Sequence, residues 1–322
     1  MDRSQKLFEA AIAAEEAGQS AKALRLYEQA STIDPSAPHV RLRWASLLFD
    51  EGRWNDSIQV ARQIIKKRPR VYQAHRLIAS SYDELGRLLL AERFYKQSLA
   101  IKQMPESWVL LASVLDRLRR NEEAEDCLHK ALRVDPDYEE AHYNLGCIYR
   151  WNGKSKLAEK HLRRAIKIDR KYSLAYAQLG QLLSSSRRND TTREAVRFLT
   201  KAVRCNPEDG WSRAYLANGL WTLKRLNAAE DQYRKLLELW PDNSLPYWCY
   251  GDFLAYERTD IPTAEKYLRR ALEIEPKSEL TNYYLGKHLQ MWGRTKEAKR
   301  LLRRAARLGH SEAKERLREL EA

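Results

Sequence analysis

Small residues recur at a nearly constant interval along this chain of 322 residues, and no other feature restricts its fold so strongly. The first column of small residues has steps of 33 to 37 residues. Its members are Ala11, Ala45, Ala79, Ala112, Gly146, Gly180, Ala217, Gly251 and Gly286. A second column, usually 12 residues further on, consists of Ala23, Ser57, Ala91, Ala124, Ala158, Ala195, Ala229, Ala264 and Ala298. Self-similarity with this period predicts a repeat protein, in which each unit buries its apolar side against its neighbours.

Each repeat has the pattern of two amphipathic helices joined by a short turn. Between residues 143 and 168, apolar side chains recur at three- and four-residue spacing, which is the period of a helix. Small residues at the facing positions allow two helix axes to approach to about 8 Å. Prolines close most repeats, because a proline ends one helix and precedes the next. They are Pro35, Pro69, Pro136, Pro207, Pro241 and Pro276.

This pattern resembles the tetratricopeptide repeat, whose units have the same period and the same small, aromatic and proline positions. The resemblance covers residues 4–312 as nine tandem repeats. It implies an all-α fold, a right-handed superhelical α-solenoid of helix-turn-helix repeats whose first helices line a concave groove. The expected repeats are 4–37, 38–71, 72–104, 105–138, 139–172, 173–209, 210–243, 244–278 and 279–312, followed by a capping helix over 311–322, in a single solenoid over 1–322. Two turns are longer than the pattern requires, by three residues between Ser184 and Thr192 and by one near Asp260.

Composition places further limits on the chain. It has 58 Lys and Arg against 44 Asp and Glu, a net charge of +14, and only 12 Gly and 10 Pro, which argues against a disordered or collagen-like chain. No apolar run reaches the roughly 18–20 residues of a membrane helix, and the N-terminal residues do not have the pattern of a secretory signal. The four cysteines include no C-x-x-C pair, which is typical of free thiols in a reducing compartment. We therefore expect a cytoplasmic protein without a membrane span.

The sequence contains none of the common motifs of catalytic, nucleotide-binding or metal sites. His75 and His142 share one repeat position, where bulky side chains pack between helices, and Cys205 occupies a position otherwise filled by Leu and Ile. We expect these side chains to be buried, whereas Cys147 and Cys249 are expected to project towards the groove. The chain is accordingly predicted not to be an enzyme and to use no cofactor or metal.

Aromatic and amide side chains are concentrated on the expected groove side of the first helices in repeats five to nine. Aromatic rings with polar tips provide much of the binding energy in protein interfaces. The candidate residues are Tyr143, Asn144, Arg150, Trp151, Asn218, Trp221, Trp248, Asp252, Tyr256, Tyr283, Tyr284 and Lys287. We predict an interaction scaffold or adaptor whose groove binds a segment of another protein. Packing of these rings between adjacent repeats stays an alternative at each position.

Positive charge is the second candidate signal, and residues 161–322 hold 32 basic side chains against 21 acidic ones. Arg163, Arg234 and Arg269 each have a glutamate four residues earlier and are expected to form ion pairs. A neighbouring column on the expected convex side lacks this glutamate and consists of Lys130, Arg164, Lys201, Lys235, Arg270 and Arg304. We expect these cations to be uncompensated, which makes nucleic acid, RNA above all, an alternative partner. A third alternative is the recognition subunit of a separately encoded enzyme.

Overall fold

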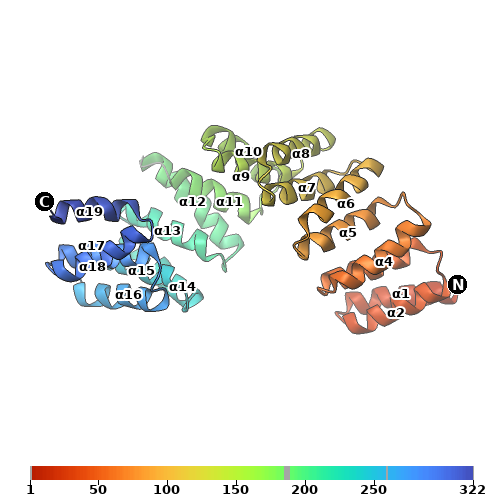
Figure 1. Ribbon diagram of the computed structural model, residues 1–322, viewed down its shortest axis with the longest axis horizontal. Helices are drawn as coiled ribbons and strands as arrows, with labels where there is room; N and C mark the ends of the chain where they lie inside the picture. Colours follow the sequence, from red (N-terminus) through yellow and green to blue (C-terminus); the bar gives the residue numbers. More distant parts are fainter. Residues whose placement is uncertain (1, 185–188, 259, 322) are drawn as a thin grey trace. The chain divides into compact units, whose positions relative to one another are not determined.

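The computed structural model describes residues 2–184, 189–258 and 260–321, and the chain divides into two compact units, Met1–Ile168 and Asp169–Ala322 (Figure 1). The helices of the first unit are α1 (Arg3–Glu16), α2 (Ser20–Ile33), α3 (Pro38–Asp50), α4 (Trp54–Lys67), α5 (Tyr72–Glu84), α6 (Leu88–Ile101), α7 (Pro105–Arg117), α8 (Asn121–Val134), α9 (Glu139–Trp151) and α10 (Ser155–Ile168). Those of the second unit are α11 (Ser173–Ser184), α12 (Asn189–Cys205), α13 (Gly210–Thr222), α14 (Leu226–Leu239), α15 (Ser244–Phe253), the π-helical turn η1 (Leu254–Arg258), α16 (Ile261–Ile274), α17 (Glu279–Met291), α18 (Thr295–Arg307) and α19 (Ser311–Glu321).

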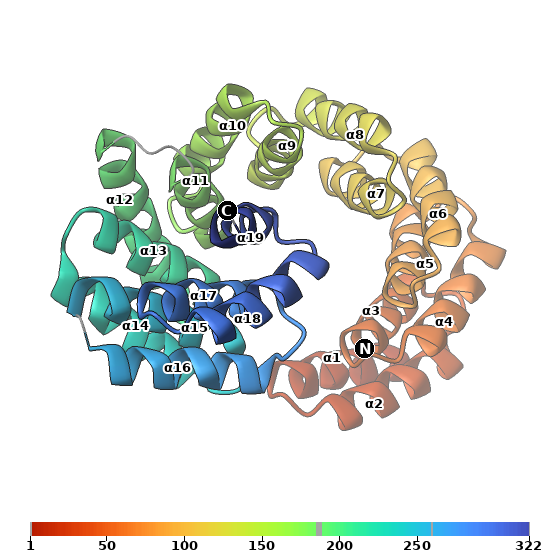
Figure 2. The same cartoon turned by 60° about the vertical axis from the view of Figure 1, so that its left-hand side comes forward.

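Consecutive helices pair as hairpins, which confirms the predicted all-α solenoid of helix-turn-helix repeats. Within the first unit, the second helices α4, α6 and α8 lie on the outer side of the first helices α3, α5 and α7 (Figure 2). Within the second unit, α15 and α17 lie side by side. The predicted repeat bounds stay predictions, and of the long turn from Ser184 to Thr192, residues 185–188 lie outside the described part of the chain.

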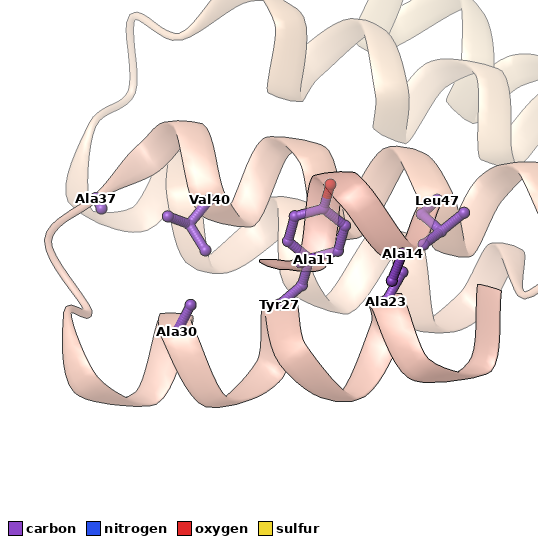
Figure 3. Packing of buried hydrophobic residues seen from close by; sticks show 8 residues of the cluster. All are labelled: Ala11, Ala14, Ala23, Tyr27, Ala30, Ala37, Val40 and Leu47. Atoms are coloured by element: carbon purple, nitrogen blue, oxygen red, sulfur yellow. The ribbon is translucent and has the colours of Figure 1, made fainter. Parts of the chain in front are cut away.

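The small-residue columns are the places where the two helices of a hairpin touch. Ala11, Ala23 and Ala30 of the first hairpin are fully buried together with Tyr27, in a cluster that continues to Val40 of the next hairpin (Figure 3). A larger side chain at these positions would push the helices apart and expose the apolar surface between them.

Glycine replaces alanine in this column where the helices approach more closely. A Cβ atom at Gly146 would lie 2.6 Å from Cγ of the fully buried Leu162. Gly180 has the same relation to Leu199, where the corresponding distance is 2.5 Å. At these positions the hairpin can close only because the residue has no side chain.

One hydrogen bond recurs at the six turn prolines. In each case the proline carbonyl oxygen accepts from a side chain six residues further along, near the start of the next helix, and so satisfies a backbone group left free where the preceding helix ends. The pairs are Arg41 with Pro35 (2.6 Å), His75 with Pro69 (2.8 Å), His142 with Pro136 (3.1 Å), Arg213 with Pro207 (2.7 Å), Tyr247 with Pro241 (2.9 Å) and Asn282 with Pro276 (3.0 Å). The side chain at this position is therefore a hydrogen-bond donor in all six cases. His75 and His142 stabilise a turn in addition to packing between helices.

Cys205 is exposed, so the expectation of a buried thiol there is wrong. It is the last residue of α12, and residues 204–208 are all exposed around it. The repeat column predicts burial only while the helix continues to pack against its neighbours.

Substitution of Gly146 by alanine tests the close approach of α9 and α10. Overpacking costs about 1–3 kcal/mol, whereas alanine in a helix interior gains about 1 kcal/mol over glycine, so we expect a net loss of stability. Urea unfolding measures it. In a double-mutant cycle, Leu162→Ala, which removes the Cγ atom nearest to the added methyl group, should cost less in the Gly146→Ala background than alone. A Gly146→Ala variant more stable than the wild type would contradict the steric account.

Candidate functional site

The predicted groove residues fall into two groups, one in each unit. Tyr143, Asn144, Arg150 and Trp151 lie on α9 of the first unit. The remaining residues lie on α13, α15, η1 and α17 of the second unit, and they are Asn218, Trp221, Trp248, Asp252, Tyr256, Tyr283, Tyr284 and Lys287. Each group is therefore a candidate surface of its own unit.

A π-helical turn shapes the candidate surface of the second unit. Helix α15 has 10 residues and continues directly into the five residues of η1, whereas α13 and α17 have 13 residues each. A π turn holds an additional residue, which accounts for the extra residue that the repeat pattern places near Asp260. The turn carries Tyr256 and Glu257, whose side chains contact the hairpins on either side.

Glu257 connects the π turn to α13. Its Oε1 atom accepts hydrogen bonds from Nζ of Lys224 at 2.6 Å and from Nε1 of Trp221 at 2.8 Å, and these two contacts lower the pKa of the Glu257 carboxyl. Lys224 has a left-handed backbone with φ 58°, at the turn position where the hairpin of α17 and α18 has Gly293. A left-handed backbone costs a lysine of order 1 kcal/mol, and such strain is concentrated at functional sites.

Asp252, Lys287 and His288 form a buried charged cluster between α15 and α17. The Oδ1 atom of Asp252 lies 2.7 Å from Nε2 of His288 and 3.2 Å from Nζ of Lys287. Because a carboxylate accepts, Nε2 of His288 carries a hydrogen, and its Nδ1 atom has no hydrogen-bond partner among the described residues. This cluster fixes the spacing of the two helices that carry the aromatic residues.

Three tyrosine rings enclose the ammonium group of Lys287. Its Nζ atom lies 4.8 Å from the ring centre of Tyr256, 4.9 Å from that of Tyr284 and 6.0 Å from that of Tyr283. Burial acts to lower the pKa of Lys287, but the Asp252 carboxylate and the Tyr256 hydroxyl outweigh it and leave that pKa above its ordinary value. Only 12% of the Lys287 side chain is exposed, so its ammonium group interacts mainly with Asp252 and the tyrosine rings and is largely inaccessible to a partner.

Most of the candidate rings pack between hairpins. Trp248 stacks on Tyr284 with ring centres 4.6 Å apart, and the buried Tyr283 stacks on His310 at 4.0 Å. Trp221, Trp248 and Tyr284 are half-buried, whereas Tyr256 is 42% exposed. The packing alternative therefore holds fully for Tyr283 and in part for Trp221, Trp248 and Tyr284, and Tyr256 is the ring most available to a partner in this group.

Asn218 adds an exposed amide to the same surface. Its Oδ1 atom accepts a hydrogen bond of 2.5 Å from the hydroxyl of the fully buried Tyr233. This contact fixes the orientation of the amide and leaves its NH₂ group for a ligand.

The group on α9 is dominated by one exposed tryptophan. Trp151 is 82% exposed, and the guanidinium carbon of Arg150 lies 5.6 Å from the centre of its ring. Tyr143 and Asn144 are half-buried. These four residues are a second candidate surface, confined to the first unit.

A histidine pair supports α9 from behind. Nδ1 of His142 lies 2.9 Å from Nδ1 of His161, and Nε2 of His142 lies 3.1 Å from the Pro136 carbonyl oxygen. Since that carbonyl accepts, neutral His142 carries its hydrogen on Nε2 and accepts from Nδ1–H of His161. Burial, with His142 beside it, lowers the pKa of His161 from 6.5 to about 4, and burial also lowers the pKa of His142.

The expectation of an uncompensated basic column is wrong for four of its six members. Lys130 pairs with Asp126 at 2.6 Å and Lys235 with Asp231 at 2.9 Å. Arg164 pairs with Asp137, and Arg270 pairs with Glu273 at 3.0 Å. The ammonium of Lys201 lies 5.2 Å from the ring centre of Tyr176, and Arg304 is exposed. An aspartate four residues before Lys130 and Lys235 is the signal that a search for glutamate alone misses.

The three arginines beside this column form the ion pairs expected of them. Arg163 lies 2.8 Å from Glu159, Arg234 lies 2.7 Å from Glu230, and Arg269 lies 2.7 Å from Glu265. These contacts confirm the i,i+4 pairing predicted from the sequence.

The two groove cysteines are poor nucleophiles. Cys249 is buried and Cys147 half-buried, and burial raises the pKa of both thiols. A thiol needs the opposite shift to react readily at neutral pH. Neither residue adds reactive chemistry to the surface.

The fold and the surface define a class of protein, an all-α repeat solenoid of the kind that serves as a protein–protein interaction scaffold. Three family models, each described as tetratricopeptide repeat, match residues 14–81, 105–146 and 139–172. The matched parts of the chain are therefore tetratricopeptide repeats.

The curated relatives are enzymes by name. The human protein O-mannosyl-transferase TMTC3 is 27% identical over 255 residues, which cover 77% of this chain and 27% of that protein. The human protein O-mannosyl-transferase TMTC1 is 25% identical over a region that covers 64% of this chain and 23% of that protein. The Drosophila melanogaster protein O-mannosyl-transferase Tmtc1 is 31% identical over a region that covers 41% of this chain and 16% of that protein. The chain thus spans about a quarter of the length of the two human relatives. These names overturn the expectation that the protein has no enzymatic role, which rested on motifs sought within this sequence alone.

Solved structures share the fold at low sequence identity. Cut9–Hcn1 from an APC/C hetero-tetramer has a TM-score of 0.62 at 18% identity, covering 84% of this chain and 52% of that one. Pseudomonas aeruginosa PilF has a TM-score of 0.59 at 19% identity, covering 67% and 97%. Human IFIT1 with m7Gppp-AAAA has a TM-score of 0.56 at 17% identity, covering 94% and 80%. Across residues 2–184, 189–258 and 260–321, the structure has no helix with the length and apolar character that a membrane span requires.

The histidine pair predicts a pH-dependent stability. A histidine whose pKa is lower in the folded than in the unfolded chain stabilises the fold above pH 6.5, and this stability is lost as the pH falls towards 4. Between pH 7.5 and 5.5 we expect a loss of roughly 1 kcal/mol, measured by urea unfolding. The His161→Phe variant should lose correspondingly less over this interval. Equal losses in wild type and His161→Phe would refute this role of the pair.

Proposed function

We propose that the second unit binds an extended segment of another protein along α13, α15, η1 and α17. We further propose that this segment is a protein substrate of O-mannosyl transfer, so that the chain is the part of a larger enzyme or complex that selects polypeptides.

The combination of an exposed ring and an exposed amide on a rigid support carries the proposal. Tyr256 is held by contacts to Trp221, Lys287 and His288, and the Asn218 amide is held by Tyr233. A main-chain carbonyl of an extended ligand would accept from the Asn218 amide, while an apolar or aromatic side chain would pack on the Tyr256 ring. Fixed side chains bind more tightly, because little freedom is lost on association.

The link to glycosyl transfer rests on the curated relatives. They are named as enzymes that act on proteins, and the part of this chain that resembles them folds as a repeat solenoid. A repeat surface that holds an extended polypeptide would place hydroxyl-bearing side chains at a transferase site elsewhere in the assembly.

Alanine substitution of Tyr256 tests the binding surface. Peptides selected from a random library on the wild-type chain should bind the Tyr256→Ala variant about tenfold more weakly, a loss of about 1.4 kcal/mol, as measured by fluorescence anisotropy. Ile261→Ala is the matched control, since Ile261 is also 42% exposed and starts α16. Equal affinities of the wild type and Tyr256→Ala would reject this surface.

The selected sequences test the second part of the proposal. Enrichment in Ser and Thr is the expected result, because O-mannosyl transfer requires a hydroxyl acceptor. Tight peptides that contain no hydroxyl side chain would contradict the substrate assignment and leave the polypeptide-binding surface intact.

A further inference from the structure

The positive charge of the second unit is concentrated on a single helix. Helix α18 has six basic residues and one acidic residue, and the basic ones are Lys296, Lys299, Arg300, Arg303, Arg304 and Arg307. By contrast, α14 has two basic and three acidic residues, and α16 has three and two. The ion pairs on α14 and α16 show how the same face of a second helix is neutralised elsewhere in the unit.

The only carboxylate of α18 is already engaged by other residues. Glu297 accepts from Arg269 of α16 at 2.9 Å and from Arg294 in the preceding turn at 2.5 Å. Lys296, Lys299, Arg300, Arg304 and Arg307 have no carboxylate partner among the residues that the structure describes. All of these except the half-buried Lys299 are exposed.

The arrangement of these cations opposes the stability of the helix. Lys296, Arg300 and Arg304 follow one another at four-residue spacing, and so do Lys299, Arg303 and Arg307. Like charges at this spacing destabilise a helix, because their side chains are neighbours on its surface. The apolar side of α18 is fully committed to the core, where Ala298, Leu301, Leu302 and Ala305 are buried. The row of Lys296, Arg300 and Arg304 has no compensating carboxylate among the described residues, and such a row on an otherwise well-packed helix is a local violation of the kind that marks functional sites.

We propose that the exposed face of α18 is a second docking surface, which binds an acidic segment of a partner polypeptide. Because a helix rises 1.5 Å per residue, consecutive cations within each row lie about 6 Å apart along the helix axis. The two rows together span about 17 Å along the axis, from Lys296 to Arg307. Carboxylates of an acidic segment match this spacing and would replace the repulsion within each row by attraction. This surface lies on a second helix and is separate from the proposed surface on the first helices.

A polypeptide fits this face better than nucleic acid or lipid. Helix α18 carries no aromatic residue on which a base could stack, and single-stranded nucleic acid binding combines cations with such rings. Its apolar residues are buried in the core, so the face offers no apolar anchor to a membrane. The repeat architecture is that of a protein–protein interaction scaffold.

Neutralisation of three arginines on α18 tests the proposal in the full chain. A fluorescein-labelled peptide of twelve glutamates should bind the wild type with an affinity that falls as the salt concentration rises. The same peptide should bind the triple variant Arg300→Gln, Arg304→Gln, Arg307→Gln at least tenfold more weakly than it binds the wild type. The matched control is Lys156→Gln, Lys160→Gln, Lys167→Gln on α10, which removes the same charge from exposed positions and should change the affinity less than twofold. The α18 variant should also melt at a higher temperature than the wild type, because repulsion within the rows is relieved.

Four results would overturn the proposal. Equal losses of affinity in the two triple variants would show that net charge alone attracts the peptide, and absence of binding by the wild type would remove the ligand class. Tighter binding of a twelve-nucleotide uridine RNA or of phosphatidylserine vesicles would assign the face to another class of partner. Charge-dependent self-association of the wild type, measured by analytical ultracentrifugation, would assign it to a second copy of the chain.

Discussion

The close approach of two helices within each hairpin is the constraint on which the rest of the structure depends. It requires alanine, serine or glycine at fixed positions, and at Gly146 and Gly180 even a methyl group would collide with the facing leucine. Because every hairpin closes in a similar way, the first helices of neighbouring repeats lie at a regular distance. Side chains about 35 residues apart in sequence, such as Asp252 and Lys287, therefore meet across that interface.

The surface of the second unit is built on this regularity and on one departure from it. The π turn lengthens the first helix of one hairpin and places Tyr256 over α17 and Glu257 against α13. In the resulting contacts, most of the aromatic surface packs against other side chains of the protein, and the Lys287 ammonium pairs with Asp252. The groups that stay exposed are the Tyr256 ring and the Asn218 amide, and both are held by neighbouring side chains. Such an arrangement is better suited to an extended polypeptide than to a small molecule that needs an enclosing pocket.

The fold could be predicted from the sequence because its signal is local and repeated. A small residue at a given column has the same steric role in every hairpin, so Ala11 and Gly286 report the same contact. The candidate site was predicted only as a set of residues, since the contacts of Trp248 with Tyr284 and of Trp221 with Glu257 depend on the register between hairpins. His288 and Glu257 were missed for this reason, although the extra residue near Asp260 marked the turn that brings them into the site. The basic column was misjudged because partners on the same helix other than a glutamate four residues earlier were not considered, such as Asp126 for Lys130, and because a carboxylate can also come from another element, as Asp137 does for Arg164.

Amide hydrogen exchange of the chain with a library-selected peptide tests the central claim most directly. The account predicts that the peptide slows exchange in α13, in α15 with η1, and in α17, while α14 and α16 on the other side of the same hairpins stay unchanged. Slowed exchange confined to the second helices, or to the first unit, would show that polypeptides bind elsewhere and would contradict the account.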